Sequence, residues 1–446
     1  MAFVITIGLI AYSYFSNQHT SKCCSYSINN LDTNQTTRVE AALRQLADSN
    51  SISLRKVENN ANITFNSPPD EKGEVIAQET SATPQPIVSS TILTPSINNS
   101  ISVQITGSAE RYKYELIEKS KTALNNQQNK RWKYLALGDI IPARDVYTAM
   151  RVRNDFVYPY AKIFERSKQA DLTVSNVETT IADGQNYQEG VNIMNFTAPA
   201  RALDGIIDSG IDGVNLANNH SSNGGSQKFA EMMNLLTAKG IGYFGAGLNS
   251  AESNKPWVTK VKDISIAHLG YNSVPGLIPP TASTAGGNTI AVAPWGSLQP
   301  QQVASVATEI KEAKNSNDVV IVWFQWGTEY THQANEDQRA LAHAAIDAGA
   351  DVVIATHPHW TQGVEWYKDH LIAYSLGNFV FDQNWSEETR RSVALELEFE
   401  QNNVVGAELL PIHIENLVQP RFLDPTETTY QQILHDVSNN SWWPVR

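Results

Sequence analysis

Residues 319–330 read VVIVWFQWGTEY and residues 352–359 read VVIATHPH, and these two stretches decide the fold. Each begins with at least four consecutive apolar residues, and each ends abruptly in polar side chains. Continuous apolar runs of this length are typical of strands buried on both faces, as the strands of a parallel sheet are. We therefore expect two buried strands, each followed directly by residues that can carry chemistry.

The same pattern continues outward in both directions, because short apolar runs alternate with segments of helical periodicity from residue 134 onward. The predicted strands are Tyr134–Leu137, Leu172–Ser175, Gly213–Ala217, Ile264–Leu269, Val319–Phe324, Val352–Ala355 and Leu371–Ser375. The predicted helices are Ala200–Ser209, Gln227–Lys239, Gln301–Lys314 and Glu336–Ala348, three of them followed by glycine. This alternation predicts an α/β fold with a layered sheet, and the alternating residues 393–399 predict antiparallel strands that close it.

These elements place the main domain at residues 131–425, with a C-terminal tail at residues 426–446. The apolar run Ala2–Phe15 is shorter than the roughly 20 residues that span a bilayer, so residues 1–18 are predicted to be a signal anchor or signal peptide. An ordinary buried segment is the alternative. Residues 31–70 are predicted to form a small α+β module, and residues 71–130 a Ser/Thr/Pro-rich linker that ends in a lead-in helix, Glu110–Gln128.

Composition limits the classes of partner. The formal net charge is −13, and the 33 basic residues are scattered without a Lys/Arg run, so we expect no nucleic-acid partner. An anionic ligand would have to be held locally, by a metal ion or an arginine. The only cysteines, Cys23 and Cys24, are adjacent and lie outside the main domain, which excludes a disulfide-stapled core.

Polar residues of metal-binding type follow nearly every predicted strand of the main domain. In open α/β sheets, ligands bind at the carboxyl ends of the strands. Asp, Glu, Asn and His together form mixed nitrogen and oxygen sites that suit Mn, Fe or Zn, and the His-x-His spacing lets two imidazoles face one ion. A single Asp at such a position is more often a helix cap, so the prediction of a divalent metal site rests on the whole set. Its members are Asp139, Asn176, Glu178, Asn218, Asn219, His220, Gln325, Glu329, His357, His359, Gln362 and Asn378, with Arg144 in the loop after the first strand.

In order and spacing, these segments resemble the CapA family of poly-γ-glutamate capsule synthesis proteins. The motifs that carry the resemblance are Leu137-Gly138-Asp139 with Arg144, Ser175-Asn176-Val177-Glu178, Leu216-Ala217-Asn218-Asn219-His220, Trp326-Gly327-Thr328-Glu329-Tyr330, Gly349-Ala350-Asp351, His357-Pro358-His359 with Gln362, and Ser375-Leu376-Gly377-Asn378. The family is similar to the calcineurin-like metallophosphoesterases. The resemblance therefore implies a four-layer sandwich of mixed sheets flanked by helices, with one or two divalent ions (Mn, Fe, Zn or Mg) at the strand ends.

The resemblance also implies roles for individual residues. Metal ligands would be Asp139, Glu178 as the bridging carboxylate, Asn219, Gln325, His357 and His359. Catalytic candidates would be His220 as the group that protonates the leaving group, Arg144 and Glu329. Substrate-binding candidates would be Asn176, Asn218, Gln362 and Asn378.

Two positions depart from the pattern that the resemblance implies. Ile141 stands where the phosphoesterases have a histidine, and Gln325 stands where the CapA family usually has a histidine before Trp-Gly. Each change removes an imidazole ligand, so the number of ions stays open. Thr356 is a smaller departure, since a small residue or glycine is expected before His-Pro-His.

Three functions follow as hypotheses. The first is a membrane-anchored, cell-surface hydrolase that uses a metal to cleave an amide or phosphoester bond in an anionic polymer such as poly-γ-glutamate, together with other capsule-synthesis proteins. The second is a non-catalytic component that binds the polymer or assembles the capsule machinery. A soluble intracellular phosphoesterase is a third hypothesis, which the N-terminal apolar run opposes.

Overall fold

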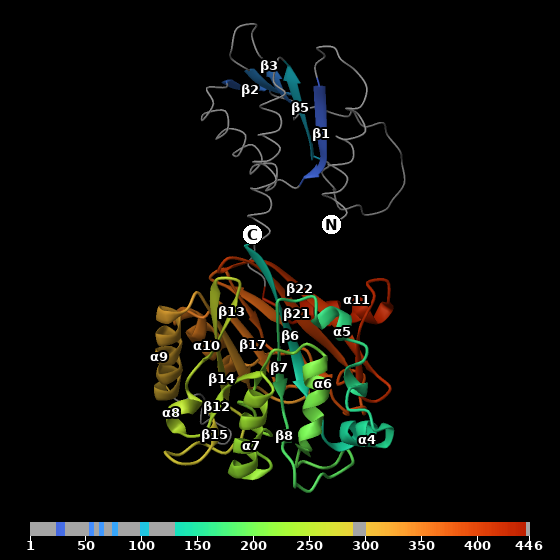
Figure 1. Cartoon of the computed structure of the whole chain (residues 1–446), viewed down its shortest axis with the longest axis vertical. Coiled ribbons are helices and arrows are strands. Elements are labelled where there is room, and N and C mark those ends of the chain that lie inside the picture. Colours follow the sequence, from blue (N-terminus) through green and yellow to red (C-terminus); the bar gives the residue numbers. More distant parts are fainter. Residues whose placement is uncertain are drawn as a thin grey trace. The chain divides into compact units, whose positions relative to one another are not determined.

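A computed structural model describes residues 130–288 and 300–442 and, nearer the N-terminus, the backbone of five strands (Figure 1). The chain divides into two compact units, Met1–Asn126 and Gln127–Arg446. The first contains a five-stranded sheet in the order β1-β5-β3-β4-β2. Its strands are β1 (Cys24–Leu31), β2 (Ser53–Val57), β3 (Asn62–Asn66), β4 (Glu74–Gln78) and β5 (Asn99–Thr106).

This sheet is larger than the predicted α+β module, because β4 and β5 lie within the stretch interpreted as a linker. The predicted N-terminal anchor and the lead-in helix Glu110–Gln128 lie outside the described residues. Among the residues that the structure describes, no helix combines the length and the apolar character needed to cross a membrane.

The second unit is built on two large sheets. The eight-stranded sheet has the order β11-β10-β7-β6-β21-β22-β23, with β20 also paired to β6. Its strands are β6 (Arg131–Ile140), β7 (Leu172–Val177), β10 (Gly213–Asn215), β11 (Gly242–Phe244), β20 (Asn378–Val380), β21 (Arg391–Glu400), β22 (Asn403–Glu415) and β23 (Gln419–Phe422). The central strands β6, β7, β10 and β11 are parallel, and β21 to β23 are antiparallel as the alternation of residues 393–399 predicted.

The six-stranded sheet has the order β13-β14-β16-β17-β19-β18. Its strands are β13 (Trp257–Val261), β14 (Ile264–Asn272), β16 (Val319–Gln325), β17 (Val352–Thr356), β18 (Val364–Tyr367) and β19 (His370–Ala373). The two apolar stretches that decide the fold are therefore neighbours, since β16 and β17 pair in parallel. Two small ribbons complete the strands, β8 (Thr180–Ile181) with β9 (Thr197–Ala198) and β12 (Ala246–Gly247) with β15 (Gly286–Gly287).

Helices cover the outer faces of both sheets (Figure 1). They are α4 (Arg144–Arg153), α5 (Phe164–Ser167), α6 (Leu203–Asp208), α7 (Gly225–Ala238), α8 (Ser250–Ser253), α9 (Pro300–Ser316), α10 (Glu336–Asp347) and α11 (Thr428–Asn439), with short 3-10 turns η1 (Tyr158–Tyr160) and η2 (Ala200–Ala202). Helices α4, α6 and α7 pack on the eight-stranded sheet, while α9 and α10 pack on the six-stranded one.

Alternation along the central strands produces the layers. In β6, Trp132 and Tyr134 face the other sheet, while Leu135 and Leu137 face the helices. In β16, Ile321 and its alternate neighbours likewise join the cluster between the sheets. Because both faces of these strands are buried, their sequence is apolar throughout, which is why periodicity identified them. The α/β fold is confirmed: helices, two sheets and helices lie in succession.

The packed second unit extends beyond residue 425 and includes helix α11. In α11, Ile433 and Val437 lie one helical turn apart and are buried against the cluster between the sheets. Trp442 follows, and its backbone N–H donates to the carbonyl of Val364 at 2.9 Å. Residues 428–442 thus belong to the packed unit, because an i, i+4 pair of apolar residues gives the helix a face to bury.

Candidate metal centre

The carboxyl ends of the parallel strands bring the predicted metal ligands together. Asp139 lies at the end of β6, Glu178 follows β7, and His357 and His359 follow β17. Ligand atoms of Asp139, Glu178 and His359 all lie within 4.8 Å of one another, and all three side chains are buried. A second set, Glu329 with His357 and His359, meets the same distance and shares His359.

Asp139 is completely buried and is oriented by two donors. Asn176 Nδ2 donates to its Oδ1 at 2.8 Å, and the backbone N–H of His357 donates to its Oδ2 at 3.3 Å. Burial raises the pKa of Asp139 to about 7, because the surrounding protein replaces the water that would solvate the carboxylate. A cation beside it would reverse this preference and hold the carboxylate ionised.

Glu178 is the clearest indication that a cation fits here. Gln325 Nε2 donates to its Oε1, but Oε2 has no hydrogen-bond partner among the described residues, although it is buried. Burial, and next the negative charge of Asp139, raise the pKa of Glu178 well above its usual range. Two buried carboxylates side by side are unfavourable without compensation, and a divalent ion bound to both would provide it.

His357 and His359 are held in unusual backbone conformations. Their φ angles are +95° and +60°, in the left-handed region that costs a non-glycine residue about 1–3 kcal/mol. His359 Nδ1 lies 2.9 Å from Asn378 Oδ1. That oxygen can only accept, so Nδ1 carries the proton and Nε2 keeps the lone pair that a metal requires.

Burial also keeps both imidazoles neutral. It lowers the pKa of His357 to about 3, and the pKa of His359 lies well below its usual range for the same reason. The neutral form is the one that binds a metal. Asp139, Glu178 and His359 therefore lie close enough to share a divalent ion, and His357, which groups with His359 and Glu329, is a second neutral imidazole at the site.

His220 lies beside this cluster, half-buried and stacked on Phe196 with ring centroids 3.8 Å apart. Its Nδ1 is 3.0 Å from Asn223 Oδ1, which also accepts the backbone N–H of Phe196 at 2.8 Å. Asn223 thus presents an acceptor, so His220 carries its proton on Nδ1 and leaves Nε2 free. Burial lowers the pKa of His220 to about 4, and the positive charge of Arg144 adds to this shift.

The four residues predicted to bind substrate instead use their side-chain amides within the protein. Asn176 and Asn218 are fully buried and bonded to each other, with Asn218 Nδ2 donating to Asn176 Oδ1 at 3.0 Å. Gln362 Nε2 donates to the carbonyls of Thr331 and Gln333, at 3.1 and 3.2 Å. Of these residues, Asn176 donates to Asp139 and Asn378 contacts His359, so these two position ligands.

Arg144 also has internal partners. Its guanidinium forms a buried ion pair with Asp382 and donates to the carbonyls of Val191 and Ile193 at 3.0 and 3.3 Å, with Phe196 stacked 4.5 Å from its central carbon. Only Nε is left without a partner among the described residues. Part of the charge predicted to meet an anionic substrate is therefore neutralised by Asp382.

Sequence reasoning missed Asp382, although its position carried a signal. It follows the buried run Phe379-Val380-Phe381, so it is a carboxylate at a strand end like the others. Ile141, by contrast, belongs to the apolar cluster under the helices and cannot act as a ligand. Glu329 is exposed, and its pKa is raised by partial burial.

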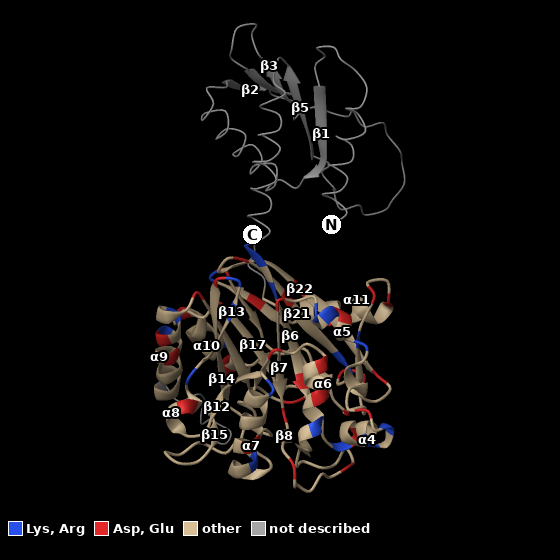
Figure 2. Ribbon diagram, in the orientation of Figure 1, with Lys and Arg blue, Asp and Glu red and all other residues tan. Residues whose placement is uncertain are grey.

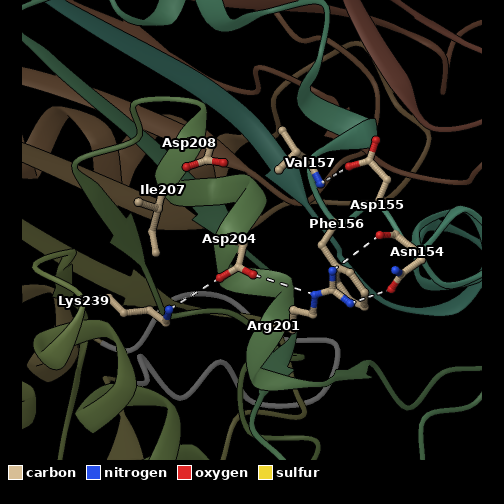
Figure 3. A pocket seen from close by; sticks show the side chains of 9 residues that line it. All are labelled: Asn154, Asp155, Phe156, Val157, Arg201, Asp204, Ile207, Asp208 and Lys239. Carbon is tan, nitrogen blue, oxygen red and sulfur yellow. Dashed lines mark hydrogen bonds and ion pairs between the residues drawn. The ribbon is translucent and has the colours of Figure 1, made fainter.

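A surface hollow elsewhere on the unit contains none of the candidate residues (Figure 3). It lies between the end of α4, helix α6 and the end of α7. Figure 3 shows four of its polar residues joined in a chain: Asp204 lies between Arg201 and Lys239, and Arg201 donates to Asn154 at 2.7 Å. Over the described elements of this unit, acidic and basic residues are interspersed (Figure 2).

Fold and site together define an α/β protein with a buried carboxylate and imidazole cluster, suited to a divalent ion, at the carboxyl ends of its parallel strands. Residues 133–383 match the model of the bacterial capsule synthesis protein family PGA_cap. The chain belongs to this family.

Three relatives are similar to this chain. The capsule biosynthesis protein CapA of Bacillus anthracis is 28% identical over 72% of this chain and 77% of its own length. The PGA biosynthesis protein CapA of Bacillus subtilis is 31% identical over 62% of this chain and 70% of its own length. A probable polyglutamine synthesis accessory protein of Mycobacterium tuberculosis is 24% identical over 45% of this chain and 55% of its own length. The CapA resemblance inferred from the motifs is confirmed.

Proposed function

We propose that this chain is a metal-dependent hydrolase of poly-γ-glutamate capsule biosynthesis that cleaves an amide or phosphoester bond in an anionic polymer. The observation that carries the proposal is the buried group of Asp139, Glu178 and His359, whose ligand atoms lie within 4.8 Å of one another. A buried carboxylate pair with an unpartnered oxygen is costly in a merely structural role. The names of the Bacillus relatives support the capsule polymer as the substrate.

The cluster has the parts that hydrolysis needs. When bound, a divalent ion supplies Lewis acidity at the scissile centre and makes water acidic enough to serve as a nucleophile near neutral pH. Asp139, Glu178 and His359 would hold the ion. Asn378 Oδ1 accepts a hydrogen bond from His359 Nδ1, so the lone pair of the ring lies on Nε2. The ion would also provide the local positive charge that an anionic polymer needs to approach an acidic protein.

His220 is the residue placed to move a proton. Its Nδ1 proton is held by Asn223, so proton exchange takes place at Nε2. Because burial lowers its pKa to about 4, the ring is neutral at rest, so Nε2 would first accept the proton that the attacking water loses and then pass it to the leaving group. Its charge would lower the pKa of both His357 and His359, which places it within electrostatic reach of the cluster.

We further propose that the protein works at the outer surface of the cell, held to the membrane through its N-terminal segment and acting with other capsule-synthesis proteins. The apolar residues Ala2–Phe15 support the export of the chain. Digestion of intact cells with an added protease tests this location. Loss of the full-length chain is expected, and full protection in intact but not in lysed cells would contradict it.

Activity is tested by measuring metal content together with the hydrolysis of phosphodiester and poly-γ-glutamate substrates. Wild type should bind a divalent ion and cleave at least one of the two substrates. Asp139→Asn should lose activity because it changes a ligand, and His357→Ala because it removes the second imidazole of the site. A wild type that binds no ion, or that hydrolyses both substrates no faster than these two substituted proteins do, would contradict the proposal.

The alternative is a non-catalytic component that grips the carboxylates of the polymer. Gln325 and Ile141 favour it, because each stands where an imidazole ligand is expected and a site with fewer imidazole ligands is less suited to catalysis. Polymer binding that is retained in Asp139→Asn without any hydrolysis by wild type would support this alternative.

A further inference from the structure

Gln325 contacts three of the predicted metal ligands, namely Glu178, Asn219 and His357. Its Nε2 donates to Glu178 Oε1 and to Asn219 Oδ1, the latter at 3.0 Å, and lies 3.5 Å from His357 Nδ1. These three acceptor atoms converge on one nitrogen. A carboxylate oxygen, an amide oxygen and an imidazole nitrogen are also the atoms that would surround a divalent ion.

The orientation of the Gln325 amide decides what it can do, since its oxygen could bind an ion and its nitrogen cannot. Gln325 Oε1 accepts from Thr356 Oγ1 at 2.7 Å and from Asn176 Nδ2 at 3.1 Å. If the amide were reversed, its nitrogen would face the nitrogen of Asn176 and its oxygen would face the oxygens of Glu178 and Asn219. The contacts of the oxygen and those of the nitrogen therefore favour the same orientation of the Gln325 amide, with Nε2 toward Glu178 and Asn219.

Asn176 is itself fixed by a chain of hydrogen bonds. Its Oδ1 accepts from Asn215 Nδ2 at 2.9 Å and from Asn218 Nδ2 at 3.0 Å, which leaves its nitrogen facing Gln325. Asn215 Oδ1 in turn accepts the backbone N–H of Ala217 at 3.1 Å.

Asn218 is fixed in the same way. Its Oδ1 accepts the backbone N–H groups of His220 and Ser221, at 3.2 and 2.8 Å. Backbone N–H groups can only donate, so the relay from them through Asn218 and Asn176 to Gln325 admits a single orientation.

We propose that the amide group of Gln325 takes the place of a second cation, so that this chain binds one divalent ion, at Asp139, Glu178 and His359. The two amide hydrogens are directed at Glu178 Oε1 and Asn219 Oδ1 and satisfy these acceptors without an ion, whereas Glu178 Oε2 has no partner among the described residues. This inference rests on the metal centre of the proposed function and specifies its nuclearity.

The test counts ions bound to the full-length chain. Wild type and variants are equilibrated with Mn²⁺ or Zn²⁺, freed of loose ions, and analysed by inductively coupled plasma mass spectrometry against protein concentration. Gln325→His replaces the donor with an imidazole ligand, and Gln325→Glu replaces only the NH₂ group with a carboxylate oxygen. The matched control is Gln419→Glu, a buried glutamine whose Nε2 donates to the carbonyl of Tyr158 and which is not among the ligands.

We expect one ion per chain for wild type and Gln419→Glu, and two for Gln325→His and Gln325→Glu. Two ions in wild type, or one ion in both folded Gln325 variants, would overturn the inference while leaving the metal centre standing. No ion in wild type would overturn the metal centre of the proposed function and this inference with it. Thermal melting identifies folded variants, and if one Gln325 variant does not fold, the other decides.

Discussion

Replacing Asn378 with alanine tests how the ligands are held in position. Asn378 Oδ1 holds His359 Nδ1 at 2.9 Å, while its Nδ2 donates to the carbonyl of Thr389 at 2.9 Å and to Gln383 Oε1 at 3.1 Å. In Asn378→Ala the His359 ring loses the acceptor that fixes its tautomer and its direction.

The expected effect on metal binding is large. Loss of a partner that orients a ligating histidine lowers metal affinity about 10–100-fold, which corresponds to about 1.4–2.7 kcal/mol. The fold should lose about 1–3 kcal/mol as well, because the buried carbonyl of Thr389 loses the donor from Asn378. The metal effect must therefore be separated from the loss of stability.

Competition titration with a chelating dye measures the Mn²⁺ or Zn²⁺ affinity, and urea denaturation without metal measures the free energy of unfolding. The control is Asn249→Ala, which removes the N-cap of α8 at a cost of about 1 kcal/mol and has no link to the ligands. It should bind metal like wild type. Unchanged affinity in folded Asn378→Ala would refute the role assigned to Asn378.

Three further changes test the packing and the electrostatics of the site. Gly138→Ala should destabilise the protein by about 1–3 kcal/mol, measured by urea denaturation, because a Cβ at residue 138 would lie 2.0 Å from the carbonyl oxygen of Gly377. Asp382→Asn should cost about 3–5 kcal/mol in the same measurement, because it leaves the buried Arg144 without a counter-charge. In metal-free protein, Asp139→Asn should become more stable relative to wild type as pH rises from 4 to 8. Burial raises the pKa of Asp139 to about 7 in the folded state, so its contribution to wild-type stability is present below pH 4 and is lost as pH rises through 7.

Controls for these changes lie within the same chain. Gly406→Ala should leave stability nearly unchanged, because its Cβ would meet Glu398 at an ordinary 3.4 Å. Lys368→Ala removes an exposed ion pair with Asp347 and should not alter unfolding measurably. Equal stability of Gly138→Ala and Gly406→Ala, or of Asp382→Asn and wild type, would contradict the packing described. A stability difference between Asp139→Asn and wild type that does not vary with pH would contradict the assigned pKa.

The sequence predicted the strands well for a physical reason. A strand buried on both faces must be apolar throughout, so Val319–Phe324 and Val352–Ala355 were visible without any knowledge of their neighbours. Because the carboxyl ends of parallel strands meet at one edge of a sheet, the same pattern predicted that Asp139 and Glu178 would meet, whereas His359 reaches them from the second sheet. Helix α11 was less evident, since only two of its side chains are buried.

The sequence could not show which polar residue faces an ion and which supports one. Asn176 and Glu178 are two residues apart, yet the first donates to Asp139 while the second places another carboxylate beside it. The difference arises from Asn215 and Asn218, which belong to the next strand and the loop after it. Such choices depend on side-chain contacts across strands, which spacing along the chain does not encode.

The central claim is that Asp139, Glu178 and His359 hold a divalent ion. Anomalous diffraction from crystals of the protein grown with Mn²⁺, with data collected on the high-energy side of the Mn absorption edge, tests this claim most directly. We expect one strong anomalous peak within bonding distance of a carboxylate oxygen of Asp139, Oε2 of Glu178 and a ring nitrogen of His359. Ordered side chains at these residues with no anomalous peak between them would contradict it.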